Sequence, residues 1–206
     1  MPDDQPQTRI QRDRRASILE AGLEVFAGDG FRGATLDEIA QAAGLSKPNL
    51  LYYFPSKEAV YQELLATLLD TWLDPLRAMD PAGEPVEELL AYVRRKVDLA
   101  HDYPRESRLF AGEILRGAPH LQDKLAGELR RMVDDWVVTI QGWMEAGRLA
   151  PSDPHHLIFS IWALTQHYAD FDVQVRAVLG PKRDPWDEAR AHLDTHFRRM
   201  LTPPPT

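Results

Sequence analysis

The chain of 206 residues contains no cysteine, which excludes disulfide bonds, thiolate metal sites and cysteine nucleophiles. It also lacks any apolar run near the ~20 residues that a membrane-spanning helix needs, and its first fifteen residues contain no apolar leader segment. A cytoplasmic protein is therefore the simplest expectation. Because 44% of the residues are hydrophobic, a chain of this length can bury a full core in one or two domains.

Several sequence patterns that are typical of enzymes are missing as well. The chain has no glycine-rich phosphate loop, no G-x-S-x-G, no H-E-x-x-H and no convincing carboxylate pair. Glu188, His192 and His196 follow one another at four-residue spacing and could ligate zinc, although such a triplet is more often a polar outer face. We therefore predict neither an enzyme, nor a cofactor, nor a metal site.

The chain also lacks a net positive charge. The formal net charge is -8, and residues 1–57 hold seven basic and eight acidic residues. Any affinity for nucleic acid must therefore come from individually placed contacts and from dimerisation rather than from a bulk positive field.

The most informative segment is TLDEIAQAAGLSKPNLLYYFPSK, residues 35–57. Thr35 and Glu38 are spaced as a capping box, and apolar residues follow at helical period until Gly44 ends the helix. Ser46 can cap a second helix of about 9 residues, or ~14 Å, which is long enough to enter a major groove. The pattern predicts a DNA-reading helix-turn-helix, although helix, turn and helix also occur in bundles that bind no nucleic acid.

Polar side chains on and around the second helix are the candidates for DNA contact. Asn49 is the best candidate for a base edge, whereas the tyrosines and Lys57 are better suited to phosphate. The predicted DNA-binding residues are Thr35, Ser46, Lys47, Asn49, Tyr52, Tyr53 and Lys57.

The segment ahead of the motif forms an apolar stripe at Ile18, Gly22 and Phe26 that can pack against both motif helices. Four arginines, at positions 9, 12, 14 and 15, precede this stripe. They can hold phosphates or reach a minor groove, or they can form an ordinary solvated helix start.

The rest of the chain has helical periodicity throughout. Helices are predicted over 56–79, over a segment that contains residues 89–97 and ends near 101, and over 104–117, 119–146, 154–179 and 186–201. No segment alternates with the period of a strand. We therefore predict an all-α protein with an N-terminal three-helix DNA-binding head, residues 1–55, and a C-terminal helical body for ligand binding and dimerisation, residues 56–206.

One stripe in the body is chemically unusual, because Ile158, Trp162, Gln166 and Asp170 recur every four residues in an apolar helix. The amide of Gln166 offers an acceptor beside donors, which matches the edge of a small cyclic imide or amide, and a tryptophan face can stack on a flat heterocycle. Alternatively, Gln166 satisfies backbone carbonyls or contacts a partner subunit.

The stripe that ends at Phe26, followed by TLDEIAQAAGLSKPNLLYYFPSKEAVY, resembles the helix-turn-helix head of the TetR family of bacterial transcriptional regulators. Three body segments resemble a pyrimidine-utilisation regulator of that family. They are DYPRESRLF at 102–110, EILRGAP at 113–119, and the long segment 147–180.

The resemblance implies a homodimer that binds a palindromic operator and is released by uracil or thymine. The apolar helices over roughly 154–200 are expected to form the dimer contact, since a monomer would leave them wet. The alternative is a TetR-like regulator that responds to a different small flat ligand or to a protein partner. By resemblance, the ligand-binding residues are Trp72, Leu73, Phe110, Trp162 and Gln166.

Overall fold

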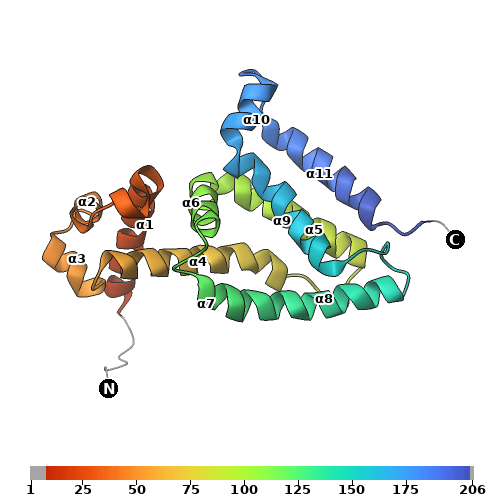
Figure 1. Ribbon diagram of the computed structural model, residues 1–206, viewed down its shortest axis with the longest axis horizontal. Coiled ribbons are helices and arrows are strands. Elements are labelled where there is room, and N and C mark those ends of the chain that lie inside the picture. Colours follow the sequence, from red (N-terminus) through yellow and green to blue (C-terminus); the bar gives the residue numbers. More distant parts are fainter. Residues whose placement is uncertain (1–7, 205–206) are drawn as a thin grey trace. The chain divides into compact units, whose positions relative to one another are not determined.

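The computed structural model describes residues 8–204, and throughout this range the chain forms helices joined by short loops, without strands (Figure 1). The prediction of an all-α fold is therefore confirmed. The start of the chain, where no leader segment is predicted, lies partly outside the described residues. The chain divides into two compact units, residues 1–68 and 69–206. This division falls inside helix α4 (Lys57–Arg77), whereas the predicted domain boundary precedes that helix.

The first unit contains α1 (Arg9–Gly33), α2 (Leu36–Ala42), α3 (Lys47–Tyr53) and the first part of α4. Thr35 and Glu38 form the predicted capping box, because Thr35 Oγ1 accepts from the Glu38 N–H at 3.2 Å and the Glu38 carboxylate accepts from the Thr35 N–H at 2.8 Å. Ser46 caps α3, which has 7 residues rather than about 9. The helix is shorter because Phe54, the residue before Pro55, is extended.

The core of the first unit confirms the predicted stripe of α1. Gly22 belongs to this stripe because a Cβ there would lie 3.0 Å from Val60 Cγ1 of α4. Glycine thus allows the two helices to approach closely. The buried side chains include Ile18, Phe26, Ile39, Leu50 and Phe54.

The second unit contains the end of α4 and the helices of the body (Figure 1). α5 contacts both α9 and α11, and α6 packs on α9. The helices are α5 (Pro85–Asp102), α6 (Pro104–Leu115), α7 (Gln122–Lys124), the π-helical turn η1 (Leu125–Leu129), α8 (Arg130–Glu145), α9 (Pro154–Asp170), α10 (Asp172–Leu179) and α11 (Pro185–Leu201).

Two predicted helices of the body are interrupted. The helix predicted over 119–146 begins at Gln122 and widens into η1 before α8. The helix predicted over 154–179 is two helices, because Phe171 leaves the helical region (φ -114°, ψ 28°) and separates α9 from α10. Hydrophobic spacing continues across both irregularities, so the sequence pattern alone does not reveal them.

Candidate nucleic-acid interface and effector site

The outer surface of α3 contains the strongest candidates for DNA contact. Asn49, Tyr52 and Tyr53 line a hollow of about 260 Å³ together with Arg14 and Leu45. Asn49 is exposed, and Tyr52 is 74% exposed with its ring edge against Tyr53 at a centroid distance of 5.1 Å. The structure therefore brings an amide, two phenols and a guanidinium together on one face.

The two candidate lysines differ in their surroundings. Lys47 Nζ donates to Asp37 at 2.9 Å, and because both side chains are solvated this ion pair is weak enough to exchange for a phosphate. Lys57 Nζ instead donates to the backbone carbonyls of Phe31 at 2.7 Å and Ala34 at 2.8 Å. An ammonium has three donors, so Lys57 holds the end of α1 and keeps one N–H for a phosphate.

The hydroxyls of Thr35 and Ser46 are exposed but already engaged in capping. Thr35 Oγ1 also donates to the Glu38 carboxylate at 2.7 Å. Both residues position α2 and α3, and any contact that they make with DNA must coexist with these hydrogen bonds.

The arginines before the motif do not form one uniform cluster. Arg9, Arg12 and Arg14 are exposed. Arg15 is half-buried, donates through Nη1 to the carbonyl of Tyr53 at 2.8 Å and pairs with the Glu63 carboxylate. Its role is to tie α1 to α3 and α4, which neither sequence interpretation of the cluster anticipated.

The effector candidates come from three helices of the body. Trp72 and Leu73 of α4 are buried, whereas Phe110 of α6 and Trp162 and Gln166 of α9 are half-buried. Within residues 8–204, the Nε1–H of Trp72 is buried without a hydrogen-bond partner. The Nε1–H of Trp162, in contrast, donates to the Tyr92 hydroxyl of α5 at 2.7 Å.

Sequence reasoning missed the charged part of this region. Lys96 of α5 is only 4% exposed, and its Nζ lies 5.5 Å from the centroid of the Trp72 ring. Burial lowers the pKa of Lys96 to about 8, although the Asp170 carboxylate opposes that shift. Burial also raises the pKa of Asp170, which accepts a hydrogen bond from Ser107 Oγ of α6 at 2.6 Å. The available signal was a lysine within the apolar stripe of α5, beside Val93 and Val97.

These contacts place α4, α5, α6 and α9 around one buried polar cluster, which we define as Trp72, Lys96, Ser107 and Asp170. Tyr92 pairs with Trp162, and Lys96, one turn later, is attracted by Asp170, so α5 and α9 run parallel here (Figure 1). Gln166 lies one helical turn from both Trp162 and Asp170. Two cavities, of about 590 and 460 Å³, occur elsewhere in the body and are lined by other residues.

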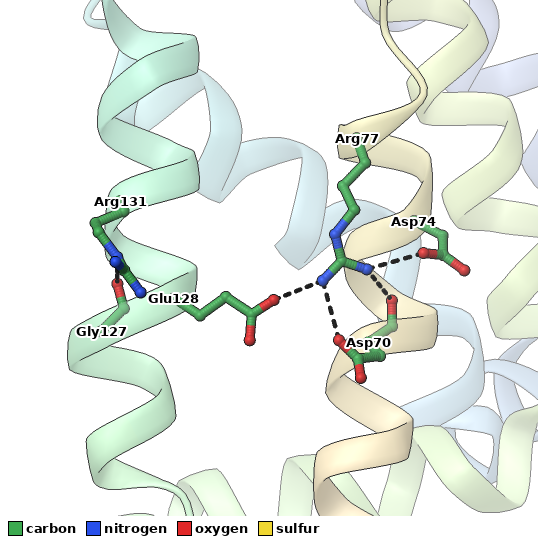
Figure 2. A network of polar contacts seen from close by, with 6 residues as sticks. All are labelled: Asp70, Asp74, Arg77, Gly127, Glu128 and Arg131. Carbon is green, nitrogen blue, oxygen red and sulfur yellow. Dashed lines mark hydrogen bonds and ion pairs between the residues drawn. The ribbon is translucent and has the colours of Figure 1, made fainter. Parts of the chain in front are cut away.

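A second polar network fixes the end of α4 (Figure 2). Arg77 donates to Asp70 and Asp74 at 2.9 Å each, within α4, and to Glu128 of η1 at 2.7 Å. The hydrogen bond that Arg77 donates to the Asp70 carboxylate is the main cause that raises the pKa of Arg77. This network attaches the last turns of α4 to the π-helical segment.

The histidines of α11 lie on the same helix as Glu188. Glu188 is paired with Arg183, and across residues 8–204 no three histidine or acidic side chains are grouped so that they could hold a metal ion.

Apolar side chains are exposed along α9, α10 and α11, in the segment predicted to form the dimer contact. Val173 and Val178 of α10 are 85% and 80% exposed. The cavity of about 460 Å³ is bounded by the same three helices. Further exposed apolar residues are Phe159, Leu164, Phe171 and Met200.

Comparison with known proteins also divides the chain within α4, four residues before the boundary between the two compact units. Residues 18–64 match the family model described as bacterial regulatory proteins, tetR family, and residues 65–203 match the model described as YcdC-like protein, C-terminal region. The HTH-type transcriptional regulator RutR of Escherichia coli K12 is 50% identical over 173 residues, which cover 84% of this chain and 82% of RutR.

Solved structures agree at the level of the fold. A putative transcriptional regulator from Streptomyces coelicolor is 29% identical, with a TM-score of 0.71 over 92% of this chain and 99% of that one. A tetR-family regulatory protein from Rhodococcus RHA1 is 20% identical, with a TM-score of 0.74 over 97% and 100% of the two chains.

Among the described helices, none is long and apolar enough to cross a membrane.

Proposed function

The chain belongs to the TetR family of bacterial transcriptional regulators, and we propose that it binds a palindromic operator as a homodimer and is released from it by uracil or thymine. It is a regulator of transcription and not an enzyme. Because its target is bacterial DNA, we place its action in the cytoplasm.

The head supports the DNA-binding part of this proposal. α3 is capped and exposed, and its outer face collects Asn49, Tyr52 and Tyr53 beside Arg14. We assign base reading to Asn49, because an amide can make a bidentate contact with adenine. The two tyrosines, Lys47 and the remaining donor of Lys57 contact phosphates, while Thr35 and Ser46 hold the two helices that carry these groups.

The effector part is carried by one observation: Gln166 is half-buried one turn after Trp162, and no described residue forms a hydrogen bond with its amide. A cyclic imide presents an N–H between two carbonyls, which an amide can pair with directly. Trp72, Leu73 and Phe110 supply the remaining apolar wall. RutR, at 50% identity, is the relative that makes a pyrimidine the leading choice among small flat rings.

Helix α4 provides the route from effector to DNA. Its residues 57–68 belong to the first unit and its residues 69–77, which include Trp72, belong to the second. An effector that binds one position of α4 better than another shifts the population of the two positions. We propose that, in the position of α4 that the effector favours, the distance between the two α3 helices of the dimer no longer matches the spacing of adjacent major grooves.

Calorimetry with uracil and thymine tests the effector assignment. We expect heat of binding for the wild type and its loss in Gln166→Leu, because an unpaired buried polar group on the ligand costs ~1 to 3 kcal/mol. Gln141→Leu, the same change at an exposed glutamine of α8, should bind like the wild type. Absence of heat with both bases, or unaltered uracil affinity in Gln166→Leu, would refute the pocket assignment.

A further inference from the structure

We propose that Lys96 and the Nε1–H of Trp72 form a donor pair that selects the effector by a carbonyl oxygen, so that the site favours rings with carbonyl groups and rejects rings with an amino group at that position. The inference rests on the proposed function and adds two specificity-determining groups to the same site. It starts from the hydrogen-bonding balance of the buried cluster.

The first donor is the indole of Trp72. This side chain is 6% exposed, and within residues 8–204 its Nε1–H has no acceptor. Buried donors are almost always paired, so an unpaired one needs an explanation. The ammonium of Lys96 lies over the face of the same ring, at 5.5 Å from its centroid. The edge that carries the N–H is the part of Trp72 that can donate a hydrogen bond to a ligand.

The second donor is Lys96 itself. Its side chain is 4% exposed and carries up to three N–H donors but no acceptor. Its attraction to Trp72 is a cation–π contact, which stabilises the positive charge but uses none of the N–H donors in a hydrogen bond. Asp170 attracts the ammonium, yet that carboxylate also receives the Ser107 hydroxyl at 2.6 Å.

Two other donors of the region, on Trp162 and Ser107, are already paired. The Nε1–H of Trp162 donates to the Tyr92 hydroxyl at 2.7 Å, and Ser107 donates to Asp170. The Nε1–H of Trp72 is therefore the group that needs an acceptor, and Lys96 has N–H donors for the same acceptor. A carbonyl oxygen that reaches Trp72 and Lys96 supplies it, while Gln166 pairs with the ring N–H beside that carbonyl.

An exocyclic amino group at the same position would face two donors and leave three groups unpaired. Sites that hydrogen-bond one group of a ligand discriminate strongly against an analogue without it, for this reason. The donor pair therefore predicts selection of uracil over cytosine, in which an amino group replaces one carbonyl.

Titration of the wild type, Lys96→Met and Trp72→Phe with uracil and with cytosine tests the proposal. Methionine keeps the volume of the lysine stem and removes the donors, and phenylalanine keeps an aromatic ring without its N–H. We expect Lys96→Met to weaken the binding of uracil about tenfold to a hundredfold. The same variant should reduce the ratio of the affinity for uracil to the affinity for cytosine. Trp72→Phe should also lower the affinity for uracil and the preference for uracil over cytosine, each by a smaller factor. Arg95→Met, at the exposed neighbour on α5, should leave both unchanged.

The outcomes separate the two proposals. If the wild type binds uracil and both variants bind it within twofold of the wild type, the donor pair is refuted while the proposed function stands. If Lys96→Met does not fold, Trp72→Phe decides alone by the same criterion. If the wild type binds neither uracil nor thymine, the proposed function fails and the donor pair fails with it.

Discussion

Asn49 is the exposed side chain that we propose reads the operator sequence. Replacing it with alanine should weaken operator binding and relax preference at one base pair in each half-site, because a bidentate contact is worth ~1 to 3 kcal/mol of discrimination. Fluorescence anisotropy with an operator selected from random DNA by the wild type measures both effects. Ser17→Ala, at an exposed position of α1, is the matched control. Unchanged affinity together with unchanged preference in Asn49→Ala would show that Asn49 reads no base.

Lys96 links protonation to stability. Its pKa is lowered from 10.5 to about 8 in the folded chain, so between these values the unfolded chain binds a proton that the folded chain does not. Stability should therefore rise as pH increases from about 8 towards 10.5, by an amount of roughly 3 kcal/mol at most. Below pH 8 the cost of burying the charge, beside Trp72 and Asp170, is fully present.

Urea unfolding of the wild type and Lys96→Met across this pH range measures the effect as a difference. The variant should be the more stable protein at pH 7, and its advantage should shrink as pH rises. A difference that stays constant from pH 7 to pH 10 would contradict the assignment of a buried, charged lysine.

At the scale of the helices, the sequence specified those features that depend on local chemistry. The capping box at Thr35, the cap at Ser46 and the apolar stripe of α1 are all present, because each depends on residues within a few positions of one another. The break at Phe171 and the π-helical turn η1 were not foreseen, since the hydrophobic spacing continues across both. Trp162 and Gln166 were recognised from spacing, whereas Lys96 required its neighbours in space.

The contact between α1 and α4 gives a prediction at this scale. Gly22→Leu should destabilise the head by ~1 to 3 kcal/mol, because even a Cβ there would lie 3.0 Å from Val60 Cγ1. Gly28→Leu is the control, since a Cβ at Gly28 meets nothing within 4 Å. Thermal unfolding followed by circular dichroism compares the two. Equal stability of both variants would mean that the close approach of α1 and α4 is not a constraint.

At the scale of the whole molecule, we expect a second copy of the chain to cover the exposed apolar residues of α9, α10 and α11. Light scattering at micromolar concentration should give twice the chain mass of 23.4 kDa. Val178→Asp, on α10, should shift the protein towards monomer, whereas Val138→Asp, at a similarly exposed valine of α8, should not. A monomeric wild type would defeat the model of two half-sites read by two heads.

The central claim is that binding of a pyrimidine weakens binding of the operator to the same protein. A single titration tests this claim most directly. The wild type is titrated into labelled operator, selected from random DNA, with and without saturating uracil. Because coupling between two binding sites is reciprocal, operator affinity should fall with uracil by the same factor by which operator lowers uracil affinity. Gln166→Leu should bind operator equally well in both conditions. Operator affinity of the wild type that is unchanged by saturating uracil would contradict the account.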